Sequence, residues 1–152
     1  MELEEFVESM DFENNKFFYH ETSKGNGEKI IEDGLYVDGN NILGVNNILY
    51  TTASPLTSDM VPSSYEFLSF LDSEKSHGDL RDVSEFVIMC SPKEYDDRIV
   101  ELGEYYRDGK RYMGKVDKSF ICGYIDMETK EFVMNPDSDY DFYSDYGYSH
   151  HK

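Results

Sequence analysis

The first residues that could do chemistry are a histidine and a threonine at the end of a run of aromatic side chains. His20 comes directly after "FFY", and Thr22 follows two positions later. Runs rich in aromatic residues are typical of strands, and a side chain at the exit of a strand can face a cleft. Taken alone, such a histidine is more often structural than catalytic, so its neighbours decide the interpretation.

The stretches that follow His20 form an ordered series. Residues 27–33 are predicted to form a short amphipathic helix, and Gly34 fits the position just after its last turn. About thirty residues after His20, "NILYTTA" predicts a second strand that carries Tyr50. Two later stretches, "SEFVIMCSP" and "KSFICGYID", also have strand character.

This order resembles the ADP-ribosyltransferase fold, in the branch of diphtheria toxin and the poly(ADP-ribose) polymerases. In that branch a strand ends in His-Gly-Thr, a helix ends in Gly-Leu, and a strand reads roughly Ile-Tyr-Phe/Leu-Thr/Ala. The matching stretches are "YHETS", "EKIIEDGL" and "ILYTTAS", with "SEFVIMCSP" as a central strand and "KSFICGYID" as the third motif strand. The resemblance spans roughly residues 17–126. It implies an α+β domain with a split pair of small antiparallel sheets and short flanking helices.

The resemblance implies that NAD is the substrate and that it lies in a cleft between the two sheets. His20 would hydrogen-bond a ribose hydroxyl of the nicotinamide nucleoside, and backbone groups at Glu21 would hold the carboxamide. Thr22 belongs to the same motif and is expected to contact NAD. Tyr50 would stack on the cationic nicotinamide ring, a contact worth roughly 0.5–2 kcal/mol. Tyr65 would cover the opposite face of that ring.

Two departures from the family pattern bear on catalysis. Glu21 stands where the family has a glycine, and Ser119 stands where the third motif strand begins with the catalytic glutamate. Asp117 is the nearest carboxylate and, two residues earlier, is expected either on the same strand face or in a loop that presents it. We therefore assign catalysis to His20, Tyr50 and Asp117, with Ser119 as an NAD contact. The version with Ser119 itself as the third member of the site stays open.

The charge and the termini restrict the partners. The formal net charge is −18, from 32 acidic and 14 basic residues. Such a surface repels nucleic acid and anionic membranes, so neither is expected, whereas a basic protein partner or protein acceptor is compatible. The acidic N-terminus differs from a signal peptide, which predicts a cytoplasmic protein. Cys90 and Cys122 lie in apolar runs and are expected to be free thiols, and no residue spacing indicates a metal site.

The length of 152 residues predicts one domain over residues 1–135 and an acidic, tyrosine-rich tail over 136–152. The tail is expected to be either mobile or laid along the body by its tyrosines. Pro62 fits the start of a helix or a kink in it. Elsewhere we expect helices over 2–11 and 57–73, a helix or strand over 94–106, an exposed polar stretch at "GKRYMGKVD", and a hairpin of "SFICGYID" with "EFVMN".

Three hypotheses for function follow from these features. The first is an NAD-dependent mono-ADP-ribosyltransferase, a small intracellular enzyme of the toxin or the phage or bacterial effector kind. The second is an inactive module on the same fold that binds NAD, ADP-ribose or a protein. The third is an acidic interaction protein of a mobile element that blocks a basic surface. Glu66 and Glu85 are expected on a solvated face, outside the catalytic machinery.

Overall fold

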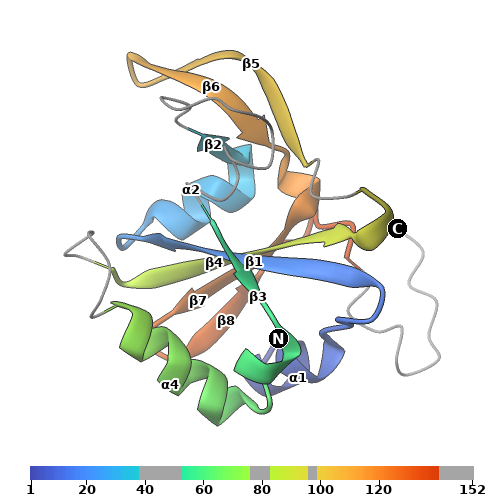
Figure 1. Cartoon of the computed structure of the whole chain (residues 1–152). Coiled ribbons are helices and arrows are strands. Elements are labelled where there is room, and N and C mark those ends of the chain that lie inside the picture. Colours follow the sequence, from blue (N-terminus) through green and yellow to red (C-terminus); the bar gives the residue numbers. More distant parts are fainter. Residues whose placement is uncertain (38–52, 76–82, 96–98, 141–152) are drawn as a thin grey trace.

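The computed structural model describes residues 1–37, 53–75, 83–95 and 99–140 (Figure 1). Within these ranges the chain forms two antiparallel sheets and three α-helices. The coarse α+β class predicted from the sequence is therefore confirmed. No helix in the described part of the chain is long and apolar enough to cross a membrane.

The larger sheet has five strands, and β1 and β4 lie near its centre. "SEFVIMCSP" forms β4, whose side chains are almost all buried, and the predicted "SFICGYID"/"EFVMN" hairpin forms β7 and β8. The strand predicted over "NILYTTA" falls mostly outside the described residues. In spatial order the strands are β3 (Ser54–Leu56), β1 (Asn15–Thr22), β4 (Glu85–Pro92), β7 (Ile121–Asp126) and β8 (Glu131–Met134).

The smaller sheet has three strands, in the order β2 (Leu35–Val37), β6 (Lys110–Val116) and β5 (Val100–Arg107). Within the stretch 94–106, for which helix or strand was expected, residues 100–106 are strand, and residues 96–98 lie outside the described residues. The stretch "GKRYMGKVD", expected to be polar and exposed, contains β6, in which Lys110 and Arg111 are exposed while Gly114 and Val116 are buried. Asp108 and Gly109 join the two strands with φ values of 51° and 79°. Asp-Gly with positive φ at both positions is the preferred sequence for a two-residue hairpin turn.

Three α-helices cover the larger sheet. The expected helix over 57–73 begins only at Ser64, because Pro62 lies between it and a preceding 3₁₀ turn. Figure 1 shows α1 and α4 on one face of the larger sheet and α2 with the smaller sheet on the other. The helices are α1 (Leu3–Ser9), α2 (Asn26–Asp33) and α4 (Ser64–Lys75), and the 3₁₀ helices are η1 (Ser58–Met60), η2 (Lys93–Tyr95) and η3 (Lys118–Phe120).

The larger sheet separates two hydrophobic cores, and β1 contributes to both. Phe17 and Tyr19 pack into the core that holds α1 and α4. Phe18 packs into the core that holds α2 and the smaller sheet. Successive side chains of a strand point to opposite faces. His20 and Thr22 therefore follow Phe18 toward α2 and the smaller sheet.

The described part of the expected tail packs against the body. Asn135 is 1% exposed, and its side-chain amide donates to the carbonyls of Lys118 and Ile121, each at 2.8 Å. The Tyr140 hydroxyl accepts a hydrogen bond from the Asp11 N–H at 2.9 Å and donates one to the Ser9 carbonyl. Burial raises the pKa of Tyr140. Residues 136–140 therefore belong structurally to the folded domain.

The Tyr140 contacts predict a measurable loss of stability in Tyr140→Phe. Removing the hydroxyl leaves a part-buried N–H and a carbonyl without this partner, which costs about 1–2 kcal/mol. Urea denaturation should show a lower midpoint than in the wild type. Tyr65→Phe is the control, because the Tyr65 side chain is 78% exposed. Equal midpoints for the two variants would contradict the anchoring role of Tyr140.

Candidate functional site

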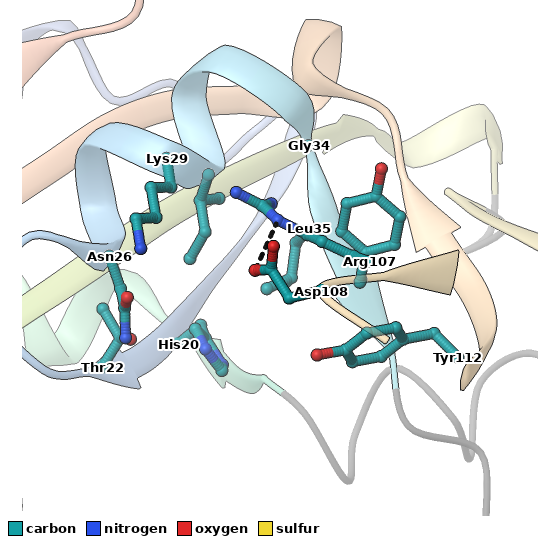
Figure 2. A pocket seen from close by; sticks show the side chains of 11 residues that line it. His20, Thr22, Asn26, Lys29, Gly34, Leu35, Arg107, Asp108 and Tyr112 are labelled. Carbon is teal, nitrogen blue, oxygen red and sulfur yellow. Dashed lines mark ion pairs between the residues drawn. The ribbon is translucent and has the colours of Figure 1, made fainter. Parts of the chain in front are cut away.

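A pocket of about 220 Å³ lies where the end of β1 meets α2 and the smaller sheet. It collects side chains from β1, from α2 and the adjoining β2, and from the β5–β6 hairpin (Figure 2). The residues that line it are His20, Thr22, Asn26, Lys29, Ile30, Gly34, Leu35, Tyr36, Arg107, Asp108 and Tyr112.

His20 reaches this pocket because of its place on β1. It pairs with Val87 of β4, so its backbone is held in the middle of the larger sheet. The alternation along β1 turns its half-buried ring toward α2 and away from α4. In Figure 2 the Tyr112 hydroxyl points toward the His20 ring, and the Asp108 carboxylate points toward the Arg107 guanidinium.

The start of α2 is fixed by a buried carboxylate. Glu85 is 4% exposed, and its two oxygens accept hydrogen bonds from the Gly25 N–H at 3.1 Å and the Gly27 N–H at 2.8 Å. The expectation that Glu85 lies on a solvated face is therefore wrong. Free N–H groups at a helix start can hold phosphate. Here the protein's own carboxylate takes two of these donors, which argues against a phosphate site at "GNGEK".

The Tyr124 ring and the Glu85 carboxylate pack so closely against the start of α2 that no side chain fits at Gly27. A Cβ there would lie 2.6 Å from Cγ of Tyr124 and 2.8 Å from Oε1 of Glu85. Between the two clamped glycines, the Asn26 amide donates to the Ser23 hydroxyl at 2.9 Å. The loop before α2 is thus held through both its backbone and a side chain, and Asn26 is presented to the pocket.

The smaller sheet supplies an aromatic and cationic wall. The rings of Tyr36 and Tyr112 lie 5.4 Å apart, centroid to centroid. The Arg107 guanidinium lies 5.3 Å from the Tyr36 centroid, and its Nη2 is 3.2 Å from Oδ2 of Asp33 at the end of α2. Cations over aromatic faces are stabilised by about 0.5–1 kcal/mol at exposed sites. Such a wall suits a ligand that combines a planar ring with anionic groups.

The predicted site residues near β1 are divided between two faces. His20 and Thr22 line the pocket together. Glu21 faces the other side, where burial and then the charge of Glu74 raise the pKa of its carboxyl. Tyr65 is 78% exposed on α4, which covers the face of the larger sheet opposite α2 (Figure 1). Tyr50 lies outside the described residues.

Asp117 and Ser119 do not lie on a strand, so that part of the prediction is wrong. They belong to the turn at η3, and β7 begins only at Ile121. Asp117 caps this turn by accepting the Ser119 N–H at 3.1 Å, and hydrogen bonding with the Ser119 side chain, followed by this backbone bond, lowers the pKa of the Asp117 carboxyl. Capping of this turn is therefore a sufficient structural explanation for an aspartate at position 117.

The strand register also separates this turn from His20. Met89 of β4 pairs with Phe18 on one side and with Ile121 on the other. Ser119 precedes Ile121, so it lies beyond the level of Phe18, away from the end of β1 that carries His20. Neither Asp117 nor Ser119 is among the described residues that line the pocket.

Sequence reasoning missed the residues that the β5–β6 hairpin brings to the pocket. Arg107 and Asp108 fall at its tip, and Tyr112 falls on β6. The signal that could have found them is the Asp-Gly pair between two stretches of strand length. Comparisons with models of known families, with curated proteins and with solved structures found no match. Among the described residues, no group of three or more His, Cys, Asp or Glu could hold a metal ion.

The buried clamp predicts that Glu85→Gln destabilises the protein. A glutamine amide presents an N–H₂ group to one of the two backbone donors, so one hydrogen bond is lost and the other loses its charge. Such bonds to charged groups contribute about 1.5–3 kcal/mol. Urea denaturation should show a loss of that size, while Glu66→Gln, which changes an exposed glutamate, should match the wild type. A wild-type midpoint for Glu85→Gln would contradict the clamp.

Proposed function

We propose that the pocket binds NAD and that the protein is an NAD-dependent mono-ADP-ribosyltransferase. Such an enzyme breaks the bond between ribose and nicotinamide and passes ADP-ribose to an acceptor. The observation that supports the proposal most directly is the position of His20. It lies at the end of β1, as the resemblance implies, and lines a pocket between the two sheets together with aromatic and cationic side chains.

The lining residues offer partners for each part of a dinucleotide. His20, Thr22 and Asn26 supply hydrogen-bonding groups for ribose hydroxyls. Lys29 and Arg107 supply positive charge for phosphate, and the Tyr36 and Tyr112 rings supply a face for a flat, cationic ring. The positive charges of Lys29 and Arg107 also favour the approach of an anionic ligand. The chain as a whole repels such a ligand, because its net charge is −18.

The size of the pocket limits how much of NAD it can enclose. Its volume of about 220 Å³ is smaller than the roughly 300–1,000 Å³ of pockets for drug-sized ligands. It can therefore enclose a nucleoside-sized part. We assign the nicotinamide riboside to the enclosed space, with the remaining nucleotide toward its open side.

A binding module without turnover is the second candidate, and one observation favours it. Glycosyl transfer through an oxocarbenium-like state relies on a carboxylate near the sugar. Neither Asp117 nor Ser119, the two residues expected at that position, lines the pocket. Calorimetry with NAD and an assay for released nicotinamide separate the two candidates. Binding with release supports the transferase, and binding without release supports the module.

The proposal predicts weaker NAD binding in His20→Ala. Losing one hydrogen bond to a ribose hydroxyl costs about 1 kcal/mol, which corresponds to an approximately fivefold higher Kd. Tyr65→Ala is the control, because this exposed side chain lies on the far face of the larger sheet and its Kd should equal that of the wild type. Calorimetry gives both values. If the wild type shows no NAD binding, the transferase and an NAD-binding module are both excluded.

A further inference from the structure

One carboxylate in the pocket comes from the tip of the β5–β6 hairpin. Of the described residues that line the pocket, Asp108 is the only acidic one. We propose that Asp108, and not Asp117, is the catalytic carboxylate that acts on the sugar during ADP-ribosyl transfer. This inference rests on the proposed function. It names a carboxylate near the sugar, which is the group whose absence would favour the binding module.

The hairpin turn explains the residue type at position 108 but leaves the carboxylate available. Asp108 and Gly109 both have positive φ, a conformation that aspartate and glycine tolerate. The Asp108 side chain is 89% exposed, so its carboxylate is accessible to a molecule in the pocket. In Figure 2 this carboxylate is turned toward the Arg107 guanidinium, on the side of the pocket that faces α2.

Arg107 ties the tip of the hairpin to the helix side of the pocket. Its guanidinium is 3.2 Å from Oδ2 of Asp33 at the end of α2 and lies 5.3 Å from the Tyr36 centroid. The same side chain places Nε 4.0 Å from Oδ2 of Asp108 (Figure 2). With 23% of its side chain exposed, Arg107 is the better buried partner. Its positive charge therefore attracts the exposed Asp108 carboxylate only weakly.

Cleavage of the bond between ribose and nicotinamide is helped by a negative charge beside the ribose. The bond between C1′ of the ribose and the nicotinamide nitrogen breaks, and its electron pair leaves with neutral nicotinamide. C1′ becomes positively charged, shared with the ring oxygen, and a carboxylate beside it stabilises that charge. The oxygen or nitrogen of the acceptor then bonds to C1′ and gives its proton to the carboxylate or to water. Asp108 has the charge and the access for both roles.

The test is Asp108→Asn, measured for nicotinamide release and NAD binding. Asn-Gly forms the same hairpin turn, so the variant removes the charge and keeps the backbone. We expect release to fall at least 100-fold, with a Kd for NAD within about threefold of the wild type and an unchanged melting temperature. Asp108→Gly, which also tolerates positive φ, serves if the asparagine variant fails to fold. Glu101→Gln, an exposed change on β5, is the neutral control.

The rival carboxylate is tested by Asp117→Asn in the same assays. Release at the wild-type rate in Asp108→Asn would overturn the inference, and a selective loss in Asp117→Asn would return the role to Asp117. NAD binding by the wild type without release would also overturn it, while leaving the pocket as a binding site. Absence of NAD binding by the wild type would instead remove the proposed function, and the inference with it.

Discussion

The pocket depends first on the contact between the Glu85 carboxylate and the start of α2. A buried carboxylate is costly unless hydrogen bonds replace its water, and here two backbone N–H groups do so at 3.1 and 2.8 Å. This contact joins β4 of the larger sheet to α2. At its other end α2 stops at Gly34, where a Cβ would lie 2.6 Å from the Val116 carbonyl of β6. One helix thus fixes the distance between the two sheets, and with it the width of the pocket.

The second constraint is the division of β1 between two cores. Phe17 and Tyr19 are buried in the core on the α1/α4 side, while Phe18 is buried in the core on the α2 side. A shift of one residue in the pairing of β1 would exchange these faces and bury polar side chains. The packing that stabilises the domain therefore also directs His20 into the pocket. Stability and the orientation of the site come from the same alternation of side chains.

The sequence predicts the elements whose signals are local. The aromatic run of β1, the Gly34 stop of α2 and the continuous apolar run of β4 each carry their own evidence, and the structure agrees with all three. β6 was missed because it belongs to a small sheet and its lysine, arginine and tyrosine side chains hide the period of two. Pairing across the chain, such as the contact of Glu85 with Gly25, has no local signal at all.

The proposed catalytic carboxylate illustrates the same limit. Reasoning along the chain could place it only at the matching point of the third motif strand, which gave Asp117 and Ser119. The sequence does carry a local signal for the structural role of Asp117, because an aspartate commonly caps a turn by accepting the N–H of a residue two positions later. Stabilisation of a developing positive charge depends on distance and dielectric, not on chain order. Under the proposed function, the β5–β6 hairpin supplies from Asp108 the carboxylate that the turn before β7 does not.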